Sequence, residues 1–460
     1  MGKALGHLMR DLLIRRKSMN ATRILAGGFA AIILIGAFLL TLPISSRAGE
    51  FTNFMDSLFT ATSATCVTGL VRVDTWLHWS FFGQAVIITL IQMGGLGFMT
   101  VIALVSLLLH RRIGLSERLI MASTFNLSDM DGVVRVVRHA LYGTFLIEGI
   151  GAALLSIRFI PEFGLASGIW RSVFHAVSAF CNAGFDLTGG KYGPFTSLEG
   201  YNHDPLILCT IMALIVIGGL GFYVWEDFLR AKGWKDLSLY SKMVLTITAS
   251  LIVGGALFFF AVEYGNPGTL GGMPIWQKIL NSFFQSITLR TAGFASLNQG
   301  ALRESSLVMS CMLMLIGGSS GSCAGGMKTV TAATLLLGLR AGLKGREEVT
   351  FRRRTISYHK VLSAMTLALM MVALFLVGAM LISLIEGVPY LSAAFETASG
   401  LATVGNSVGI TPFLSTPSML ILISLMYVGR VGVFTFSVAL LARSRQNAKI
   451  KYPNLEVLIG

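Results

Sequence analysis

Seven stretches of this chain run for about 20 residues or more without a single Asp, Glu, Lys or Arg. They cover residues 24–46, 75–110, 205–225, 243–262, 305–327, 361–385 and 397–429. A helix needs about 20 mostly apolar residues to cross the hydrocarbon core of a bilayer. Only 13% of the residues are charged, against about 25% in a soluble domain. The chain is therefore expected to be an integral membrane protein, which excludes a disordered chain, a coiled coil and a nucleic-acid binder.

Together with residues 133–157, whose apolar part is interrupted only by Glu148, these stretches predict an all-α polytopic membrane protein with eight transmembrane helices. We place the spans near 24–43, 80–109, 134–157, 205–228, 241–262, 306–338, 358–385 and 418–442. Four further apolar segments are too short to cross and are interpreted as re-entrant helices. These segments are 53–66, 171–183, 275–289 and 390–402. The first span follows a basic lead, as a signal peptide does, but its apolar run is too long and no small-x-small cleavage site follows it.

Basic residues are distributed very unequally between the two sides of the predicted spans. Eight spans place both termini on one side, and that side holds 26 of the 36 Lys and Arg residues. The other side holds 8, including Arg290, while Lys328 and Arg430 lie inside spans. Because cytoplasmic loops carry an excess of Lys and Arg, both termini are predicted to be cytoplasmic. The net charge of +14 thus reflects topology, and no nucleic acid is needed as a partner.

A short motif that ends near a glycine recurs four times, once at each predicted re-entrant helix. The motifs are FTATSATCVTGL, FHAVSAFCNAGF, FQSITLRTAGF and FETASGLATVGNS, with Gly69, Gly184, Gly293 and Gly405 spaced 115, 109 and 112 residues apart. A second echo follows in the next span, as GGLGF at 94–98 and 218–222, GGSSG at 317–321 and VGRVGVF at 428–434. Internal repeats of this kind indicate a repeated architecture. We therefore expect four units of span, re-entrant pore helix and span around a single pore per subunit.

The repeats also define the predicted domain organisation. The four units cover residues 24–110, 133–230, 240–338 and 356–442. A cytoplasmic segment, 1–23, precedes them, and a cytoplasmic tail, 443–460, follows them. The third unit differs from the others because its second span contains the glycine-rich stretch 317–329.

A glycine turn at membrane depth has a physical purpose. Extended backbone is tolerated there only where it lines a watery cavity or is buried in protein. Glycine permits backbone angles that other residues resist, so successive carbonyl oxygens can face a common axis and replace the water shell of a bare cation. Short helices that end at the cavity aim their partial negative charge at the same ion. The sequence therefore predicts a cation path that is selected by neutral backbone.

Six motifs, in order and at matching spacing, resemble those of the Ktr/Trk superfamily of potassium uptake proteins, and closely those of its KtrB-type subunits. They are TATSATCVTGL, HAVSAFCNAGFDL, QSITLRTAGF, GGSSGSCAGGMKT, ATVGNSVGITP and YVGRVGVFTF. The resemblance extends from about Thr22 to the KYPNLEVLIG tail. Trk-type relatives carry two additional N-terminal helices, whereas about 22 residues precede the first predicted span here, which favours the Ktr branch.

The resemblance implies a simplified potassium filter made by the four glycine turns, with potassium bound at backbone carbonyls. By position, its lining residues are Val67, Thr68 and Gly69; Asn182, Ala183 and Gly184; Thr291, Ala292 and Gly293; Thr403, Val404 and Gly405. Relatives that conduct mainly sodium often have serine at the first of these glycines, so Gly69 indicates potassium. Potassium is then the transported ion, sodium is a candidate activator, and no cofactor is bound covalently.

The resemblance also implies the partners and the location of the chain. It implies a homodimer in the plasma membrane of a bacterium, with a separately encoded cytoplasmic ring of nucleotide-binding subunits as regulator. The absence of a GxGxxG motif after a strand is consistent with that division. The tail IKYPNLEVLIG matches the tail that the family uses at its dimer contact.

The segment GGSSGSCAGGMKT, at 317–329, resembles a phosphate-binding loop, but Met327 separates Gly326 from Lys328, so the GxxxxGK[ST] register fails by one residue. A second interpretation is a packing site, since small residues let membrane helices approach closely. A stretch so rich in glycine makes a poor helix. The resemblance implies instead a broken helix whose loop lies under the filter as a gate. The predicted gating residues are Gly317, Gly318, Ser319, Ser320, Gly321, Ser322, Gly325, Gly326 and Lys328.

Two cations are predicted at membrane depth, where ionisable residues are costly and usually functional. The resemblance implies that Arg430 faces the pore, where it would oppose cation passage or donate hydrogen bonds to the loop or filter backbone. A buried salt bridge stays open as the alternative, and Glu148 is a candidate partner for such a bridge. Lys328 either acts in the gate or snorkels where the helix restarts.

Other polar residues near the predicted filter have simpler interpretations. Glu396 and His175 are expected to brace the pore helices rather than to bind ions. Cys66 and Cys181 are expected to be packing thiols, since they are not paired in a CxxC spacing. Outer acidic residues either concentrate cations or are ordinary solvated loop charges. These acidic residues are Asp56, Asp74, Glu162, Asp186 and Asp204.

Three classes of function suit such a chain: a gated cation pore, a secondary transporter and a membrane enzyme. Secondary transporters commonly have two inverted halves, whereas the four repeats here run in the same orientation. The spans contain no HExxH motif, paired carboxylates or Ser–His–Asp arrangement, which disfavours an enzyme. A gated potassium pore is the favoured hypothesis. A sodium-conducting member of the superfamily and a secondary cation transporter are the alternatives.

Overall fold

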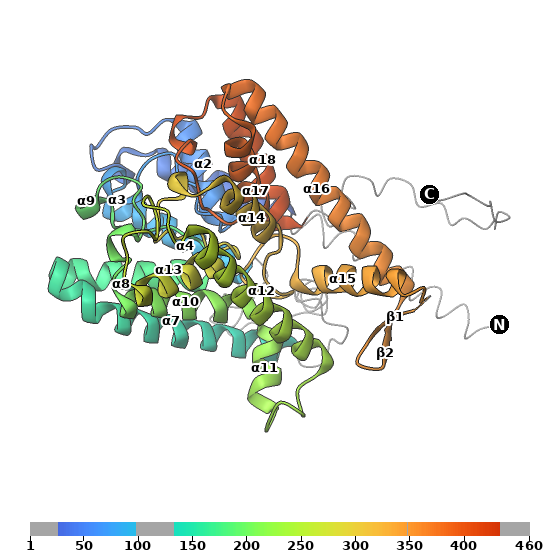
Figure 1. The fold of residues 1–460 in the computed structure, drawn as a ribbon. Helices are drawn as coiled ribbons and strands as arrows, with labels where there is room; N and C mark the ends of the chain where they lie inside the picture. Colours follow the sequence, from blue (N-terminus) through green and yellow to red (C-terminus); the bar gives the residue numbers. More distant parts are fainter. Residues whose placement is uncertain (1–25, 98–132, 347, 433–460) are drawn as a thin grey trace, which may run out of the picture.

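The computed structural model describes residues 26–97, 133–346 and 348–432 (Figure 1). Several predicted features lie outside the described residues. These are the cytoplasmic segment 1–23, residues 98–109 of the second predicted span, residues 433–442 of the last one and the tail 443–460.

The described chain is mostly helical, and one succession of elements occurs in it four times. Each time, a first helix is followed by a short helix, then by an irregular turn, and then by a second apolar helix. The first helices are Ala26–Thr41, α7 (Val133–Phe163), α12 (Leu239–Glu263) and α16 (Tyr358–Glu386). The short helices are α2 (Phe54–Thr65), α8 (Leu165–Phe180), α13 (Ile275–Thr288) and α17 (Tyr390–Ala402). The second apolar helices are α4 (Phe81–Leu96), α10 (Pro205–Leu220), α14 (Glu304–Leu315) and α18 (Thr416–Val431).

The remaining elements lie at the two ends of this helical body. Two short helices, α3 (Thr75–His78) and α9 (Gly189–Tyr192), lie at one end, on the left of Figure 1. The C-terminal end of α15 (Thr329–Leu343) and the hairpin of β1 (Val349–Phe351) and β2 (Arg354–Ile356) lie at the opposite end. Helix α11 (Phe222–Arg230) projects sideways from the body after α10. The short 3-10 helices are Pro43–Ser45, Glu199–Tyr201, Gln299–Ala301 and Thr411–Phe413.

Helix starts in the structure follow from local sequence. Asn53 caps α2, and its side-chain oxygen accepts from the backbone N–H of Met55 at 2.8 Å. Asp204 caps α10 in the same way, accepting from Leu206 N–H at 2.9 Å, with Pro205 at the first helical position. Both helices therefore begin where an otherwise free N–H group finds a side-chain acceptor.

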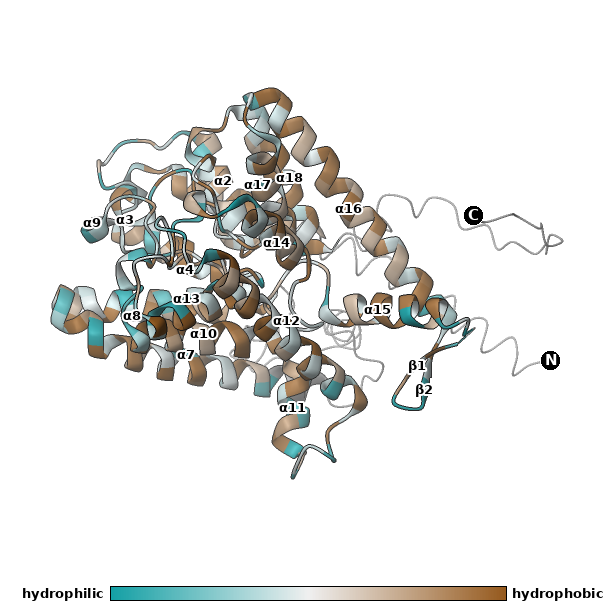
Figure 2. Ribbon diagram, viewed as in Figure 1, coloured by the Kyte–Doolittle hydropathy of each residue, from teal (hydrophilic) through white to brown (hydrophobic). Residues whose placement is uncertain are grey.

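The four short helices lie in the centre of the body, and a repeated phenylalanine anchors each of them. These residues, Phe59, Phe174, Phe284 and Phe395, are all fully buried. Each lies nine or ten residues before the glycine of its repeat. The long helices by contrast expose apolar side chains: on α16, much of which has hydrophobic colours in Figure 2, Leu369 is 69% and Leu384 is 79% exposed. Apolar residues that face outwards in this way are suited to contact with lipid.

Some of the described helices are long and apolar enough to span a membrane on their own, and others are shorter. In the described part of the chain, three helices are long and apolar enough: Arg138–Phe163, Leu239–Glu263 and Tyr358–Glu386. A fourth span arises if α10 and α11, which meet at 93°, are counted together. The helices Ala26–Thr41, α4, α14, α15 and α18 are apolar but shorter. The prediction of eight spans therefore stays a prediction, and the glycines at which several of these helices end are described below.

Candidate functional site

The four glycine turns that follow the short helices share one unusual backbone conformation. We call residues 67–69, 182–184, 291–293 and 403–405 loops one to four. In every loop the first and third residues have positive φ angles. The first residues are Val67 (58°), Asn182 (60°), Thr291 (69°) and Thr403 (53°). The third residues are Gly69 (98°), Gly184 (70°), Gly293 (80°) and Gly405 (102°). Non-glycine residues seldom adopt positive φ, so four matching cases indicate a conformation that the surrounding structure imposes.

Contacts between these loops close a ring. A Cβ atom on each loop glycine would lie far inside contact distance of the middle carbonyl oxygen of the next loop. The distances are 2.4 Å from Gly69 to Ala183, 2.7 Å from Gly184 to Ala292, 2.3 Å from Gly293 to Val404 and 2.1 Å from Gly405 to Thr68. The contacts run from loop one through loop four and return to loop one. The twelve predicted filter residues therefore lie together, and each glycine is required by close approach as well as by φ.

Hydrogen bonds hold three of the loops in the same turn. In loops one, two and four the middle N–H donates to a carbonyl five residues earlier. These bonds join Thr68 to Ser63 at 2.8 Å, Ala183 to Ser178 at 2.7 Å and Val404 to Ser399 at 2.8 Å. Loop three differs, since Ala292 N–H donates to Thr288 O at 2.9 Å, four residues earlier. The Asn182 side-chain amide lies 3.2 Å from Thr291 Oγ1 and joins loop two to loop three.

Glu396 and His175 act as braces behind the loops, as expected. The Glu396 carboxylate accepts from the Ser407 hydroxyl at 2.5 Å and from the Thr411 hydroxyl at 2.6 Å. His175 is fully buried, and its ring nitrogens lie 2.7 Å from Arg171 O and 3.4 Å from Leu187 N. Both side chains therefore tie a short helix to the chain that follows its loop.

The five outer acidic residues are engaged in local structure, so the expectation of simple solvated charges was wrong. Three form ion pairs: Asp56 with Arg72 (3.3 Å), Asp204 with Arg158 (3.0 Å) and Glu162 with Lys191. Asp74 caps α3 by accepting from Trp76 N–H at 3.0 Å, and Asp186 accepts from Thr188 N–H at 3.0 Å. Their hydrogen bonds and partners order the chain around the loops. Their effect on the local cation concentration stays a prediction.

Three of the four second helices end at a glycine. Helices α4, α10 and α18 end at Gly97, Gly221 and Gly432, whose φ angles are 83°, 91° and 96°. The glycine three residues before each break packs on the end of the short helix in its own repeat. A Cβ there would lie 2.0 Å from Thr65 O for Gly94, 1.9 Å from Phe180 O for Gly218 and 2.0 Å from Leu401 O for Gly429. The glycine echo in the sequence thus marks close packing, and at Gly221 it also marks a bend of 93° between α10 and α11.

In the third unit, the break is a loop of residues 316–328 between α14 and α15, which we call the α14–α15 loop. Its two ends meet, since Gly317 N–H donates to Met327 O at 2.8 Å. Its middle binds the end of α10: Ser319 N–H donates to Gly219 O at 3.0 Å and Cys323 N–H to Gly218 O at 3.2 Å. A helix leaves its last four carbonyls without partners, and the loop occupies two of them.

The α14–α15 loop also reaches loop four. A Cβ on Gly325 would lie 1.9 Å from Thr403 Oγ1 and 3.2 Å from Ala402 O. All nine predicted gating residues lie in this loop. The loop contacts both the ring, at Thr403, and the end of α10, at Gly218 and Gly219. The irregular backbone that its glycine content predicts is present.

Arg430, in the last turn of α18, also binds the α14–α15 loop. Its guanidinium donates to Cys323 O in the loop and to the carbonyls of Gly94 and Gly95 at the end of α4, with 3.1 Å to Gly95 O. Among the described residues no carboxylate pairs with it, so the salt-bridge alternative is wrong there. Glu148 instead accepts from Gln92 Nε2 at 3.3 Å. Backbone hydrogen bonding, one of the two roles considered for Arg430, is what the structure shows.

Lys328 and the cysteines have local roles. Lys328 Nζ donates to Ala324 O at 2.7 Å, so the side chain turns back onto the α14–α15 loop rather than snorkelling away from it. Cys66 and Cys181 are free and fully buried, as expected of packing thiols.

One residue of the site, Arg290, was not predicted to belong to it. The charge distribution predicts an outer loop for Arg290, but its side chain is 8% exposed and its Nη2 lies 3.4 Å from Gly317 O of the α14–α15 loop. The signal available was position, since Arg290 directly precedes the predicted filter residue Thr291.

Apolar helices around a closed ring of neutral glycine loops define the class of this chain as a polytopic membrane protein with re-entrant loops. A family profile described as "TrkH: Cation transport protein" matches residues 1–450. The chain belongs to the TrkH cation transport family, and its relatives are transporters rather than enzymes.

Individual relatives match along nearly their whole length. The chain is 43% identical over 450 residues to the potassium/sodium uptake protein NtpJ of Enterococcus hirae, covering 97% of this chain and 98% of the relative. It is 40% identical over 453 residues to the Ktr system potassium uptake protein B of Bacillus subtilis, covering 98% and 100%. The crystal structure of the potassium transporter TrkH from Vibrio parahaemolyticus has the same fold, with a TM-score of 0.69 at 17% identity over 91% of this chain and 85% of that one.

Proposed function

We propose that this chain is the pore subunit of a Ktr-type potassium uptake system, with eight membrane spans in four repeats. The observation that carries the proposal is the closed ring of four loops, because a ring of neutral backbone oxygens can replace the hydration shell of a cation. Each loop follows a short buried helix, whose C-terminal end adds partial negative charge at the ring. Potassium binds at the carbonyls of the twelve loop residues and crosses the membrane there.

The α14–α15 loop is the gate in this proposal. It contacts loop four through Gly325 and lies between the ring and the basic end of the molecule. Its conformation depends on hydrogen bonds rather than on a continuous helix, so it can move without unfolding a span. Arg430 places a positive charge at this level and raises the barrier to cation passage.

The sidedness and partners follow from charge and family membership. The hairpin of β1 and β2 carries the exposed residues Arg352, Arg353 and Arg354, whose charge supports a cytoplasmic location for this end of the molecule. The nucleotide-binding regulatory ring acts on this side, near the basic segment 340–360.

The subunit forms a homodimer that the cytoplasmic tail stabilises. Removal of residues 450–460 should lower the dimer fraction, which the mass of the detergent-solubilised protein measures. An unchanged dimer mass would remove the tail from the interface.

Sodium is the second candidate ion, since the Enterococcus hirae relative is named for both potassium and sodium. Gly69 favours potassium, because serine at this position often accompanies sodium conduction in the family. The decisive experiment is rubidium uptake into liposomes that contain the purified protein, with potassium or sodium as the competitor. Potassium should compete far better than sodium. Equal competition would support the sodium-conducting alternative, and saturable uptake without channel-like flux would support a secondary transporter.

A further inference from the structure

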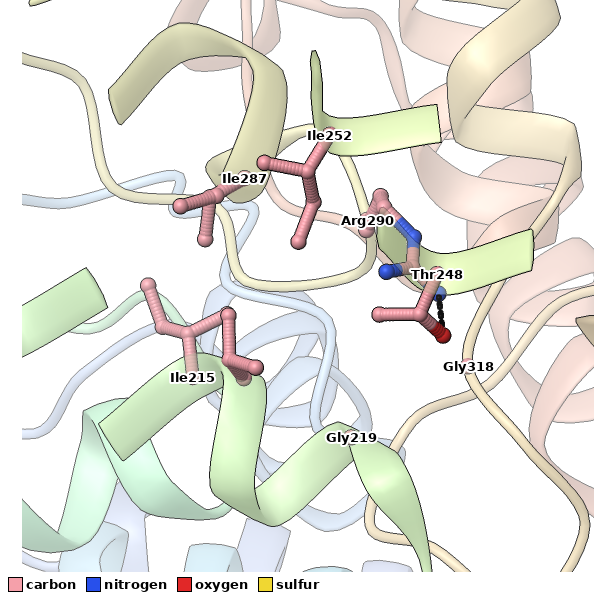
Figure 3. Close-up of a pocket in the computed structure, with 8 residues that line it drawn as sticks. Ile215, Gly219, Thr248, Ile252, Ile287, Arg290 and Gly318 are labelled. Atoms are coloured by element: carbon pink, nitrogen blue, oxygen red, sulfur yellow. Dashed lines mark hydrogen bonds between the residues drawn. The ribbon is translucent and has the colours of Figure 1, made fainter. Parts of the chain in front are cut away.

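Arg290 is buried behind loop three, where nothing in the proposed transport path requires a charge. It lies between α13 and loop three, and Figure 3 shows its guanidinium directed at Thr248 on α12, close to Gly318 of the α14–α15 loop. Its Nη2 lies 3.5 Å from Thr248 Oγ1 and 3.4 Å from Gly317 O. The cavity beside it has a volume of about 10 Å³, so the side chain has almost no space in which to relax.

The charge of Arg290 has few compensating groups. Within the described part of the chain no carboxylate is in salt-bridge range, and Nε has no hydrogen-bond partner. The C-terminal end of α13 at Thr288 lies two residues before Arg290, and that of α14 at Leu315 lies two residues before its acceptor Gly317, so both helix ends supply partial negative charge. A buried cation held mainly by helix ends and one loop carbonyl is sensitive to the position of that carbonyl.

The same position in the other three repeats is small. Cys66, Cys181 and Ala402 precede loops one, two and four, and in those repeats a glycine of the second helix packs directly on the short helix. In the third repeat, the nearest atom to a Cβ on Gly317 is instead Gly325 O, 2.0 Å away. In the other three repeats a glycine of the second helix packs directly on backbone. In the third repeat, the hydrogen bond from Arg290 to Gly317 O takes the place of that contact.

We propose that Arg290 is a positioning residue that couples loop three of the ring to the α14–α15 loop and holds that loop closed. The inference rests on the proposed function of this loop as a gate. When the loop moves away, Gly317 O leaves the guanidinium, which then stays buried with fewer acceptors. Opening is therefore disfavoured, and movement of the gate is transmitted to Thr291 through its neighbour in the chain.

The test compares Arg290→Gln and Arg290→Lys, each alone and combined with deletion of 318–326, in rubidium uptake by the full chain in liposomes. Arg290→Gln should raise uptake about tenfold, because one charge-assisted hydrogen bond is lost. Arg290→Lys should restore most of the closed behaviour. In the deletion background Arg290→Gln should have little further effect, since Gly317 remains but the part of the loop that its bond to Arg290 holds closed has been removed. Equal effects in both backgrounds would overturn the coupling, whereas absence of uptake by the unmodified chain would contradict the proposed function itself.

A second measurement does not depend on transport. Cys323 of the α14–α15 loop is fully buried, so its reaction with N-ethylmaleimide, followed by peptide mass spectrometry, reports release of the loop. Arg290→Gln and, more weakly, Arg290→Lys should accelerate this reaction. Cys311 on α14, 6% exposed, is the matched control and should react at an unchanged rate. An unchanged rate at Cys323 would overturn the proposal, and faster reaction of both cysteines would indicate general unfolding instead.

Discussion

The second and third repeats contain nearly the same glycine echo but break their second helices in different ways. In the second repeat, GGLGF turns the chain at Gly221 through 93°, and α11 starts at the next residue. In the third repeat, GGSSG opens the α14–α15 loop, and the helix restarts only at Thr329. The outer parts of the two repeats match, since both have a buried phenylalanine, a short helix and a loop glycine with positive φ.

The difference shows where the free carbonyl groups at the end of a broken helix find hydrogen-bond donors. The sharp turn at Gly221 leaves the carbonyls of Gly218 and Gly219 without helical partners, and the α14–α15 loop supplies N–H donors to both. Phe222 N–H in turn donates to Gly321 O at 3.0 Å. The bend in the second repeat and the loop in the third are therefore one structure, in which each completes the hydrogen bonding of the other.

Deleting residues 318–326 breaks this comparison most completely. The deletion removes the proposed gate and should raise rubidium uptake by at least about tenfold, a change of ~1.4 kcal/mol in the barrier, with little remaining response to the regulatory subunit. It also removes the donors to Gly218 O and Gly219 O, so the melting temperature of the purified protein should fall. Slow uptake with a full regulatory response in a folded deletion variant would return 317–329 to a packing role.

Gly69→Ser tests the ring that the repeats share. A side chain there is strained at a φ of 98° and would lie 2.4 Å from Ala183 O, so loop two must shift. The preference for potassium over sodium, measured by competition of rubidium uptake, should fall by about tenfold. Gly409→Ser is the matched control, because Gly409 has a φ of 99° with no atom within 4 Å. An equal loss of preference in both variants would assign the effect to backbone strain rather than to ring contact.

The ring was accessible to sequence reasoning because its determinants are local and repeated. Each loop has a glycine at a fixed distance from a buried phenylalanine, and four copies make the pattern visible. The irregular conformation of 316–328 was predictable for a similar reason, since its glycines disfavour a helix.

The breaks at Gly97 and Gly221 and the burial of Arg290 were not predictable in the same way. A glycine within an apolar run is compatible with a continuous span, and its tertiary contacts, such as those of Gly221 with Ser319 and Ser320, are not visible in the sequence. Arg290 lies within a sequence motif that is typical of an outward-facing segment. Its buried position depends on contacts with α12 and with the α14–α15 loop, which are distant in sequence. The partners of Arg430 were left open for the same reason, since Gly95 lies 335 residues away in the chain.

Arg430→Gln tests the contact of the α14–α15 loop with α18, as Arg290→Gln tests its contact with loop three. The substitution removes the charge and the hydrogen bonds to Cys323 O and to the end of α4, which belongs to the first repeat. Rubidium uptake should rise several-fold, because the positive charge that raises the barrier to cation passage is removed and the loop loses one of its anchors. The preference for potassium over sodium should change little, since the loop carbonyls of the ring lie elsewhere. A changed preference at an unchanged rate would place Arg430 at the ring instead.

Gly221→Ala gives the smallest expected effect and isolates the bend of the second repeat. Alanine is disfavoured at a φ of 91° and ψ of 144°, and its Cβ would lie 2.6 Å from Ser319 Oγ and 2.9 Å from Ser320 O. The free energy of unfolding should fall by about 1–3 kcal/mol, visible as a lower melting temperature. Gly254→Ala, in the interior of α12 with no atom within 4 Å, should instead leave the protein as stable or slightly more stable. Because the added methyl group also pushes on the α14–α15 loop, Gly221→Ala should raise rubidium uptake modestly, and Gly254→Ala should not. A fall in stability without any change in uptake would mean that the bend supports the fold but does not hold the loop in place.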